Sequence, residues 1–331
     1  MAGFSGIIGH EQTIEHLQQS ILKNKVNHAY LLEGPDGSGK RMIAEAFARA
    51  LQCEAGGAEG CGRCHSCKQA DSQNHPDIIL VTHEKPATIS VKDVREQIVG
   101  SVDIRPYNGK YKIYIVPEAE KMNPQAQNAL LKTLEEPPEY AVIILLTVNA
   151  SALLDTIRSR CILLKLRPVE SEVVQQYLME HLQMPDYQAR LCATFAQGSV
   201  GKALELASSE YFSQIRSSAL TLVKKADEMD IGELTAFIKE ITAWKVSVND
   251  FLDILGVWYR DVLYYKATRD ADSLIFKDEL AQIRQNASKA SYEGLEKVVQ
   301  ALQVAKDRLR ANVNFELTME LLFLTIKDST R

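Results

Sequence analysis

Short apolar runs alternate with amphipathic stretches over the first half of the chain. The apolar runs predict five strands, at residues 29–32, 77–81, 112–116, 141–147 and 162–166. Apolar residues at helical spacing predict helices over residues 14–22, 39–51, 90–99 and 123–134, and the prolines at 137 and 138 end the last of these. Strands that alternate with helices are typical of a parallel α/β domain.

The pattern changes after Pro168. From residue 169 to residue 331 we find no strand pattern, only amphipathic helices that we expect to break at Met184-Pro185, Gln197-Gly198, Gly232 and Gly256. The clearest of these helices cover residues 292–310 and 314–326. We therefore expect three domains: an α/β domain over residues 1–167, a small helical domain over 168–208 and a larger all-helical domain over 209–331.

A glycine-rich segment joins the first predicted strand to the helix that follows it. Gly34, Gly37, Gly39 and Lys40 lie close to the pattern G-x-x-x-x-G-K-[ST] of the phosphate-binding loop, or P-loop. Backbone N–H groups of such a loop cradle an anion at a helix N-terminus. Arg41 replaces the hydroxyl residue that would hold magnesium. The segment is either a nucleotide or anion cradle, with Arg41 as part of it, or a purely structural turn.

The third predicted strand ends without the expected metal ligand. Nucleotide hydrolases place an acidic residue there on the magnesium shell, and this chain has Pro117 followed by Glu118. Together with Arg41, this removes both protein contacts to magnesium and predicts a site that does not hydrolyse ATP. The alternative is a divergent working site with water-mediated metal contacts.

Four of the six cysteines are clustered, and the segment between them is rich in glycine. They are Cys53, Cys61, Cys64 and Cys67. Their C-x7-C-x2-C-x2-C spacing predicts a structural zinc module at residues 53–67, because four thiolates leave no open position for water. A redox pair or free thiols are the alternatives. We expect His65 to lie outside the metal shell, and Cys161 and Cys192 to be small core residues.

Composition and charge narrow the range of functions. The chain of 331 residues is 46% hydrophobic and 24% charged, which is ordinary for a globular protein. A net charge of −5 gives no overall attraction for nucleic acid. The longest apolar run, residues 141–146, is too short to span a bilayer, and residues 1–6 do not resemble a signal peptide. We expect a cytoplasmic protein.

Several segments together resemble the AAA+ subunits of the bacterial replicative clamp loader. They are residues 7–11 (Ile-Ile-Gly-His-Glu), 28–31, the four-cysteine insert, 128–138 (Asn-Ala-Leu-Leu-Lys-Thr-Leu-Glu-Glu-Pro-Pro), 159–161 (Ser-Arg-Cys) and 312–320. The resemblance implies an AAA+ P-loop-like domain with a parallel sheet, a zinc module, a helical lid and an all-α collar that assembles a five-membered ring. It implies a subunit of a DNA-directed DNA polymerase holoenzyme, with delta and tau/gamma subunits, the sliding clamp and primed DNA as partners and no membrane.

Three departures from the family pattern point to a subunit that does not hydrolyse ATP. The motor subunits carry threonine where this chain has Arg41, aspartate where it has Pro117, and a lid arginine where it has Gly201, with Lys202 one position out of register. The resemblance implies that Arg160 is a catalytic arginine finger on the neighbouring motor subunit's ATP. By itself, an arginine there is better explained as a surface charge on a solvated helix end. An active tau/gamma-type motor and a purely structural zinc-containing subunit remain the alternatives.

Overall fold

The computed structural model describes residues 3–83, 85–225, 229–242, 248–311 and 313–329. The chain separates into two compact units, which are described individually below. The first consists of Met1–Val174 with Ala196–Lys202, and the second of Gln175–Phe195 with Ala203–Arg331. The division into three domains remains a prediction.

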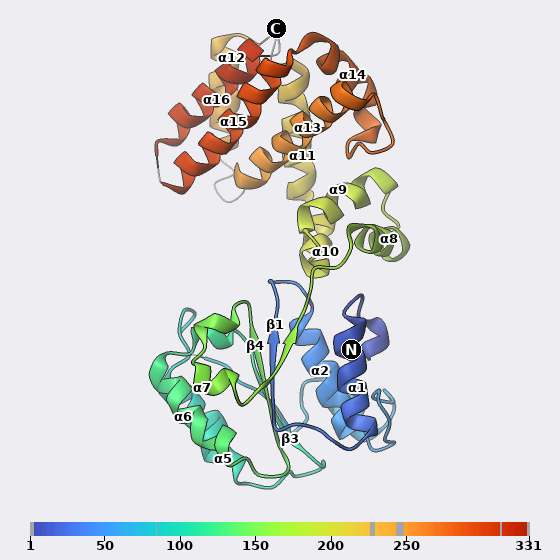
Figure 1. The fold of residues 1–331 in the computed structure, drawn as a ribbon, viewed down its shortest axis with the longest axis vertical. Coiled ribbons are helices and arrows are strands. Elements are labelled where there is room, and N and C mark those ends of the chain that lie inside the picture. Colours follow the sequence, from blue (N-terminus) through green and yellow to red (C-terminus); the bar gives the residue numbers. More distant parts are fainter. Residues whose placement is uncertain (1–2, 84, 226–228, 243–247, 312, 330–331) are drawn as a thin grey trace. The chain divides into compact units, whose positions relative to one another are not determined.

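A parallel five-stranded sheet forms the centre of the first unit (Figure 1). Its strands are β1 (Ala29–Glu33), β2 (Ile78–Leu80), β3 (Lys112–Val116), β4 (Ala141–Thr147) and β5 (Ile162–Lys165), in the spatial order β2-β3-β4-β1-β5. Leu31 of β1 lies opposite Leu145 of β4 and Leu163 of β5. The five strands predicted from the sequence are confirmed, with ends that shift by a residue or two.

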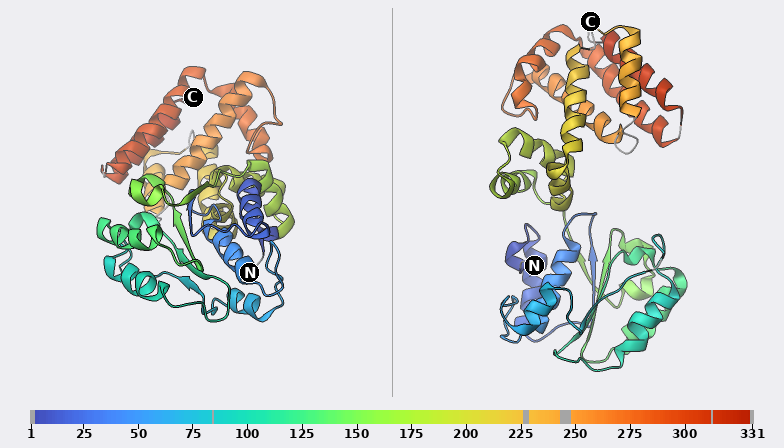
Figure 2. Two further views of the ribbon diagram at one scale, coloured as in Figure 1. Left: turned by 60° about the horizontal axis from the view of Figure 1, so that its bottom comes forward. Right: turned by 180° about the vertical axis from the view of Figure 1, so that it is seen from behind.

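Helices cover both faces of this sheet (Figures 1 and 2). They are α1 (Glu11–Leu22), α2 (Lys40–Gln52), α3 (His65–Asp71), α4 (Val91–Val94), α5 (Gly100–Val102), α6 (Pro124–Glu135) and α7 (Asp155–Arg158). Side chains alternate along each strand, so Tyr30 and Leu32 pack with the residues of α1 and α2, whereas Leu31 packs with those of α6 and α7. The sheet is therefore the middle layer of three, and its strand ends position the loops that follow.

The helix predicted over residues 90–99 is present but irregular. Ser90 and Asp93 form a capping box that starts α4. A π-helical turn, η2 (Arg95–Val99), then leads into α5. The sequence pattern did not show this π turn, nor did it predict α3 within the cysteine segment.

C-terminal to β5, the part of the chain that the structure describes contains helices and no strand, as predicted. The helices are α8 (Ser171–Leu182), α9 (Asp186–Ala196), α10 (Val200–Ser208), α11 (Glu210–Lys225), α12 (Ile231–Thr242), α13 (Val248–Thr268), α14 (Leu280–Lys289), α15 (Tyr292–Arg310) and α16 (Phe315–Ser329). The breaks predicted at Met184-Pro185 and Gln197-Gly198 are confirmed, since α9 begins at Asp186 and α10 at Val200.

The break predicted at Gly256 is wrong, whereas the one predicted at Gly232 is confirmed to within a residue or two, since α12 begins at Ile231. Gly256 lies inside α13, where the neighbouring Trp258 and Tyr259 are each 1% exposed. Burial of these aromatic side chains outweighs the roughly 1 kcal/mol that glycine costs within a helix. Gly232 lies in the first turn of α12, which Asp230 and Glu233 start through reciprocal side-chain to backbone hydrogen bonds.

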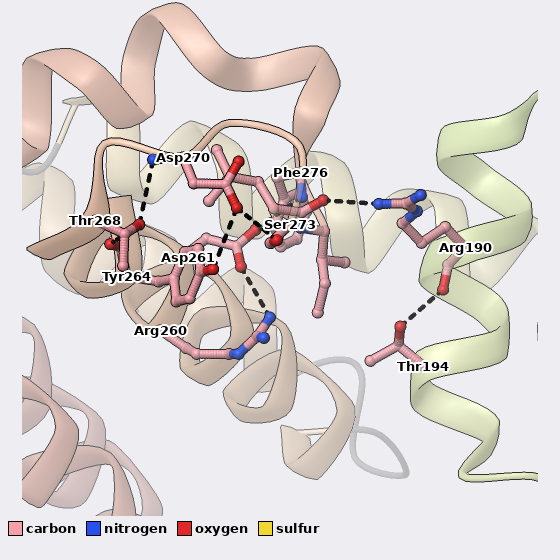
Figure 3. A network of polar contacts seen from close by, with 11 residues as sticks. Arg190, Thr194, Arg260, Asp261, Tyr264, Thr268, Asp270, Ser273 and Phe276 are labelled. Atoms are coloured by element: carbon pink, nitrogen blue, oxygen red, sulfur yellow. Dashed lines mark hydrogen bonds and ion pairs between the residues drawn. The ribbon is translucent and has the colours of Figure 1, made fainter. Parts of the chain in front are cut away.

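A buried carboxylate organises part of the second unit (Figure 3). Asp261 of α13 is fully buried, and its Oδ2 accepts hydrogen bonds from the N–H groups of Ile275 and Phe276 at 2.7 and 2.8 Å. Burial raises the pKa of Asp261. Arg190 of α9 donates to the carbonyl of Leu274 at 3.1 Å, so α9 and α13 bind the same loop. These contacts stabilise the helical unit.

Candidate functional site

The glycine-rich segment connects the carboxyl end of β1 to the N-terminus of α2. Gly37 and Gly39 have φ angles of 72° and 87°, in the left-handed region that favours glycine. The N–H of Gly34 donates to the carbonyl of Thr147, the last residue of β4, at 3.1 Å. The loop therefore lies at the carboxyl edge of the sheet, where parallel α/β proteins bind their ligands.

The Lys40 ammonium group is held by its own loop. It donates to the carbonyl of Gly34 at 2.5 Å and to that of Pro35 at 2.9 Å, and it lies 3.9 Å from the carboxylate of Asp36. Burial lowers the pKa of Lys40, while the negative charges of Asp36 and Glu120 oppose that shift. A phosphate that bound here would have to displace the carbonyls from the ammonium group.

Arg41 binds along α2. Its Nε donates to Oε1 of Glu45, one helical turn further on, at 2.7 Å, and its side chain is half exposed. The residue that replaces the magnesium-binding hydroxyl is thus paired with a carboxylate on its own helix. This contact makes a surface helix pair of the kind that adds a few tenths of a kcal/mol to stability.

The end of β3 carries a carboxylate that is already paired. Glu118 lies 2.6 Å from the ammonium group of Lys121 and 3.3 Å from Nε2 of His83. The hydrogen bond from Lys121 lowers the pKa of Glu118, and His83 adds to the effect. Pro117, which precedes it, has no group that can bind a metal. Glu120, which no sequence pattern singles out, acts on Lys40 through its negative charge.

A segment far along the chain packs onto the glycine-rich loop. The hydroxyl of Ser199 donates to the carbonyl of Asp36 at 2.9 Å, and the N–H of Gly201 donates to the carbonyl of Gly37 at 2.9 Å. A Cβ atom on Gly201 would lie 2.8 Å from Cα of Gly37, and one on Gly37 would overlap the Ser199 hydroxyl. The two glycines therefore allow two backbones to touch, and position 201 has no room for an arginine side chain.

The four clustered cysteines come together in space. Their Sγ atoms all lie within 4.8 Å of one another. The N–H groups of Cys61, Cys64 and Cys67 donate to the Sγ atoms of Cys53, Cys61 and Cys64, each at 3.3 Å. Hydrogen bonds from the backbone N–H groups of Arg63 and Cys64 lower the pKa of Cys61 to about 6, whereas burial raises that of Cys67 to about 12. This set of sulfur atoms, with N–H groups that favour thiolates, fits a tetrahedral metal ion.

His65, Cys161 and Cys192 lie outside the group of four sulfur atoms. His65 is the first residue of α3 and does not belong to the group of four sulfur ligands. Cys192 is 2% exposed, and burial raises its pKa to about 11. Cys161 is partly buried against the core, and burial raises its pKa to about 12. Both thiols are protonated at neutral pH and act as small apolar side chains.

Arg160 lies between α7 and β5 at the protein surface. Its Nη1 donates to the carbonyl of Thr156 at 2.9 Å and to the hydroxyl of Ser159 at 3.3 Å. Its Nη2 lies 2.9 Å from Oε1 of Glu135, the last residue of α6, and 35% of the arginine side chain is exposed. Within the described residues, no hydrogen bond or ion pair joins Arg160 to the glycine-rich loop. The two are separate sites.

The strand order, the loop after β1 and the helical C-terminal half define an AAA+ P-loop-type protein. The family model for the DNA polymerase III delta subunit matches residues 9–170, and that for its C-terminal part matches residues 210–328. The chain is 34% identical over 319 residues to the DNA polymerase III subunit delta' of Bacillus subtilis. This match covers 94% of each chain. The chain belongs to the delta' family of clamp-loader subunits of the DNA polymerase III holoenzyme.

The chain is also similar to a tau subunit and to a gamma subunit-related protein. The chain is 30% identical over 280 residues to the DNA polymerase III subunit tau of Escherichia coli, a match that covers 78% of this chain and 43% of that protein. It thus spans less than half the length of that relative. A gamma subunit-related protein of Thermotoga maritima is 25% identical, with a TM-score of 0.46 over 96% of this chain and 99% of that one. No described helix is long and apolar enough to cross a membrane.

Proposed function

We propose that this chain is the non-hydrolysing AAA+ subunit of its clamp loader. It assembles with delta and tau/gamma subunits and helps them to open the sliding clamp and place it on primed DNA in the cytoplasm. Its domains are the AAA+ domain (1–167), the lid (168–208) and the collar (209–331), and the collar joins the ring. The identity of 34% with a delta' subunit over 94% of both chains supports this assignment.

The contacts of the glycine-rich loop support the proposal that the chain does not hydrolyse ATP. Lys40 binds the carbonyls of Gly34 and Pro35, and Gly201 packs on Gly37 in the place of a lid arginine. Arg41 and Pro117 offer no ligand for magnesium. A hydrolytic site needs the metal ion and fixed positive charge to stabilise the transferring phosphoryl group. The loop therefore acts mainly as a structural turn that holds the lid segment.

Arg160 is the residue proposed to act in trans. A guanidinium group is always ionised and can bind a phosphate through two parallel hydrogen bonds. At the edge of β5, Arg160 is partly exposed and supported by α6 and α7. We infer that it reaches the ATP of an adjacent tau/gamma subunit, where it stabilises the charge that develops in the transition state.

We further propose that Cys53, Cys61, Cys64 and Cys67 hold one structural zinc ion. A four-thiolate shell leaves no position for a substrate, so the metal would crosslink a glycine-rich segment that has little core of its own. The mutual distances of the sulfur atoms, all within 4.8 Å, support this assignment.

The test of the first proposal is ATP binding and hydrolysis by the purified chain alone, with magnesium, beside its Lys40→Ala variant. We expect no turnover that depends on Lys40. Robust turnover that Lys40→Ala abolishes would contradict the proposal and identify an active tau/gamma-type motor with an unusual metal shell.

A further inference from the structure

The Arg160 guanidinium group is bound by three acceptors of its own chain. Two acceptors from residues 156 and 159 bind Nη1, and a carboxylate from a different helix faces Nη2. We propose that this carboxylate, Glu135, is a positioning residue for Arg160 and, through it, for the ATP site of the neighbouring motor subunit. The inference rests on the proposed finger role of Arg160.

The location of Glu135 supports a role outside its own helix. Glu135 is the last residue of α6, where the exposed carbonyl groups carry partial negative charge. A carboxylate at a helix C-terminus is unfavourable unless a cation lies near it. The last turn of α6 contains Lys132, but the cation that pairs with the Glu135 carboxylate is the Arg160 guanidinium, at 2.9 Å. This pair offsets the unfavourable position of the carboxylate.

The donor count of the guanidinium group shows what the pair leaves for a phosphate. Arginine has five N–H donors, of which Nη1 carries two, Nη2 two and Nε one. In this structure Nη1 uses its donors on Thr156 and Ser159. With Glu135 on Nη2, the donors that remain are Nε–H and one hydrogen of Nη2. Two donors suffice for a bidentate contact with a phosphate.

Holding the Arg160 side chain in place lowers the entropy that it loses when it binds the phosphate of a neighbouring subunit. Arginine loses much rotamer freedom when it is fixed, and a side chain that is already fixed has less to lose when it meets the phosphate. The finger acts on charge that develops in the transition state, so its positioning affects kcat rather than KM for ATP. A carboxylate that instead held the finger back from the phosphate would lower the rate, and its removal would raise kcat.

The experiment uses the complete loader, reconstituted from this chain with the tau/gamma and delta subunits of the same bacterium, and stimulated by clamp and primed DNA. We expect Glu135→Ala to lower kcat for ATP roughly three- to tenfold, with KM unchanged. Glu135→Gln keeps an acceptor oxygen and should retain most of the wild-type rate. Glu139→Ala removes an exposed negative charge nearby and serves as the matched control. Thermal unfolding of each variant checks that the fold is intact.

A double-variant cycle separates this inference from the finger role on which it rests. If Glu135 acts through Arg160, the rate of Glu135→Ala/Arg160→Ala equals that of Arg160→Ala alone. Additive losses, a raised kcat in Glu135→Ala, or a Glu135→Ala rate equal to wild type would overturn the positioning role while Arg160 keeps its own. If Arg160→Ala has the wild-type rate, the finger role and the positioning role both fail.

Discussion

The glycine-rich loop and the Arg160 site differ in what their charged groups contact. In the loop, the groups that would bind a nucleotide are engaged within the chain: Lys40 binds Gly34 and Pro35, and Gly37 packs on Gly201. At Arg160, the charged group is also held by the chain, yet 35% of its side chain stays exposed. A motif in the sequence therefore does not identify its role. The contacts of its charged group separate an internal function from one that is directed at a partner.

The first prediction concerns the cysteine module, which follows the C-terminal end of α2, whereas the glycine-rich loop precedes the N-terminal end of the same helix. Cys67→Ser should reduce bound zinc from one equivalent to a small fraction and lower the free energy of unfolding by about 3 kcal/mol, because a structural metal contributes to folding directly. Metal analysis with thermal unfolding measures both quantities. Cys161→Ala is the control that keeps its zinc. An unchanged metal content in Cys67→Ser would remove the four-thiolate assignment.

The contact of the glycine-rich loop with the segment around Ser199 and Gly201 should give the next largest effect on stability. Gly37→Ala would place a methyl group against Ser199 and force a left-handed φ, so we expect a loss of about 2–4 kcal/mol in the free energy of unfolding. Gly39 also has a positive φ, but a Cβ atom there meets nothing within 4 Å. Gly39→Ala should therefore cost only about 1 kcal/mol. Chemical denaturation of both variants tests the close approach, and equal losses would argue against it.

Glu118 should give the smallest effect of the three. Glu118 is paired with Lys121 and His83 and follows a proline in the place of the metal ligand, so Glu118→Gln should leave the ATPase rate of the loader unchanged. Lys121 lowers the pKa of Glu118, so the folded state gains stability above the normal pKa and loses it as the pH falls through the lowered value. Because Glu118 is half exposed, the gain is only about 0.5 kcal/mol at pH 7. Unfolding at pH 7 and at pH 3 measures this gain in stability. A lower ATPase rate in Glu118→Gln would indicate that this chain has a catalytically active ATP site.

The sequence predicted the sheet better than it predicted the contacts at either site. Strands buried on both faces, such as 141–147, read as continuous apolar runs and were found. Gly256 was misread as a helix break because the buried aromatic residues beside it outweigh local propensity. A helix-breaking residue alone does not reveal how much apolar surface its neighbours bury.

Contacts between distant residues had no local signal. Asp36 and Ser199 are 163 positions apart, and nothing in either segment indicates that the Ser199 hydroxyl donates to the Asp36 carbonyl. The sequence did suggest that Arg160 is accessible, but the pair with Glu135 depends on the end of α6 meeting the end of α7. Position along the chain does not determine which side chains meet where two helices end.

The central claim is that hydrolysis in the assembled loader depends on Arg160 of this chain and not on its Lys40. The most direct test is single-turnover ATP hydrolysis by the loader reconstituted with either Arg160→Ala or Lys40→Ala, in the presence of clamp and primed DNA. We expect Arg160→Ala to slow the ATP site that this chain completes by more than about a hundredfold, and Lys40→Ala to leave every phase unchanged. A loss with Lys40→Ala, together with an unchanged rate for Arg160→Ala, would contradict the account.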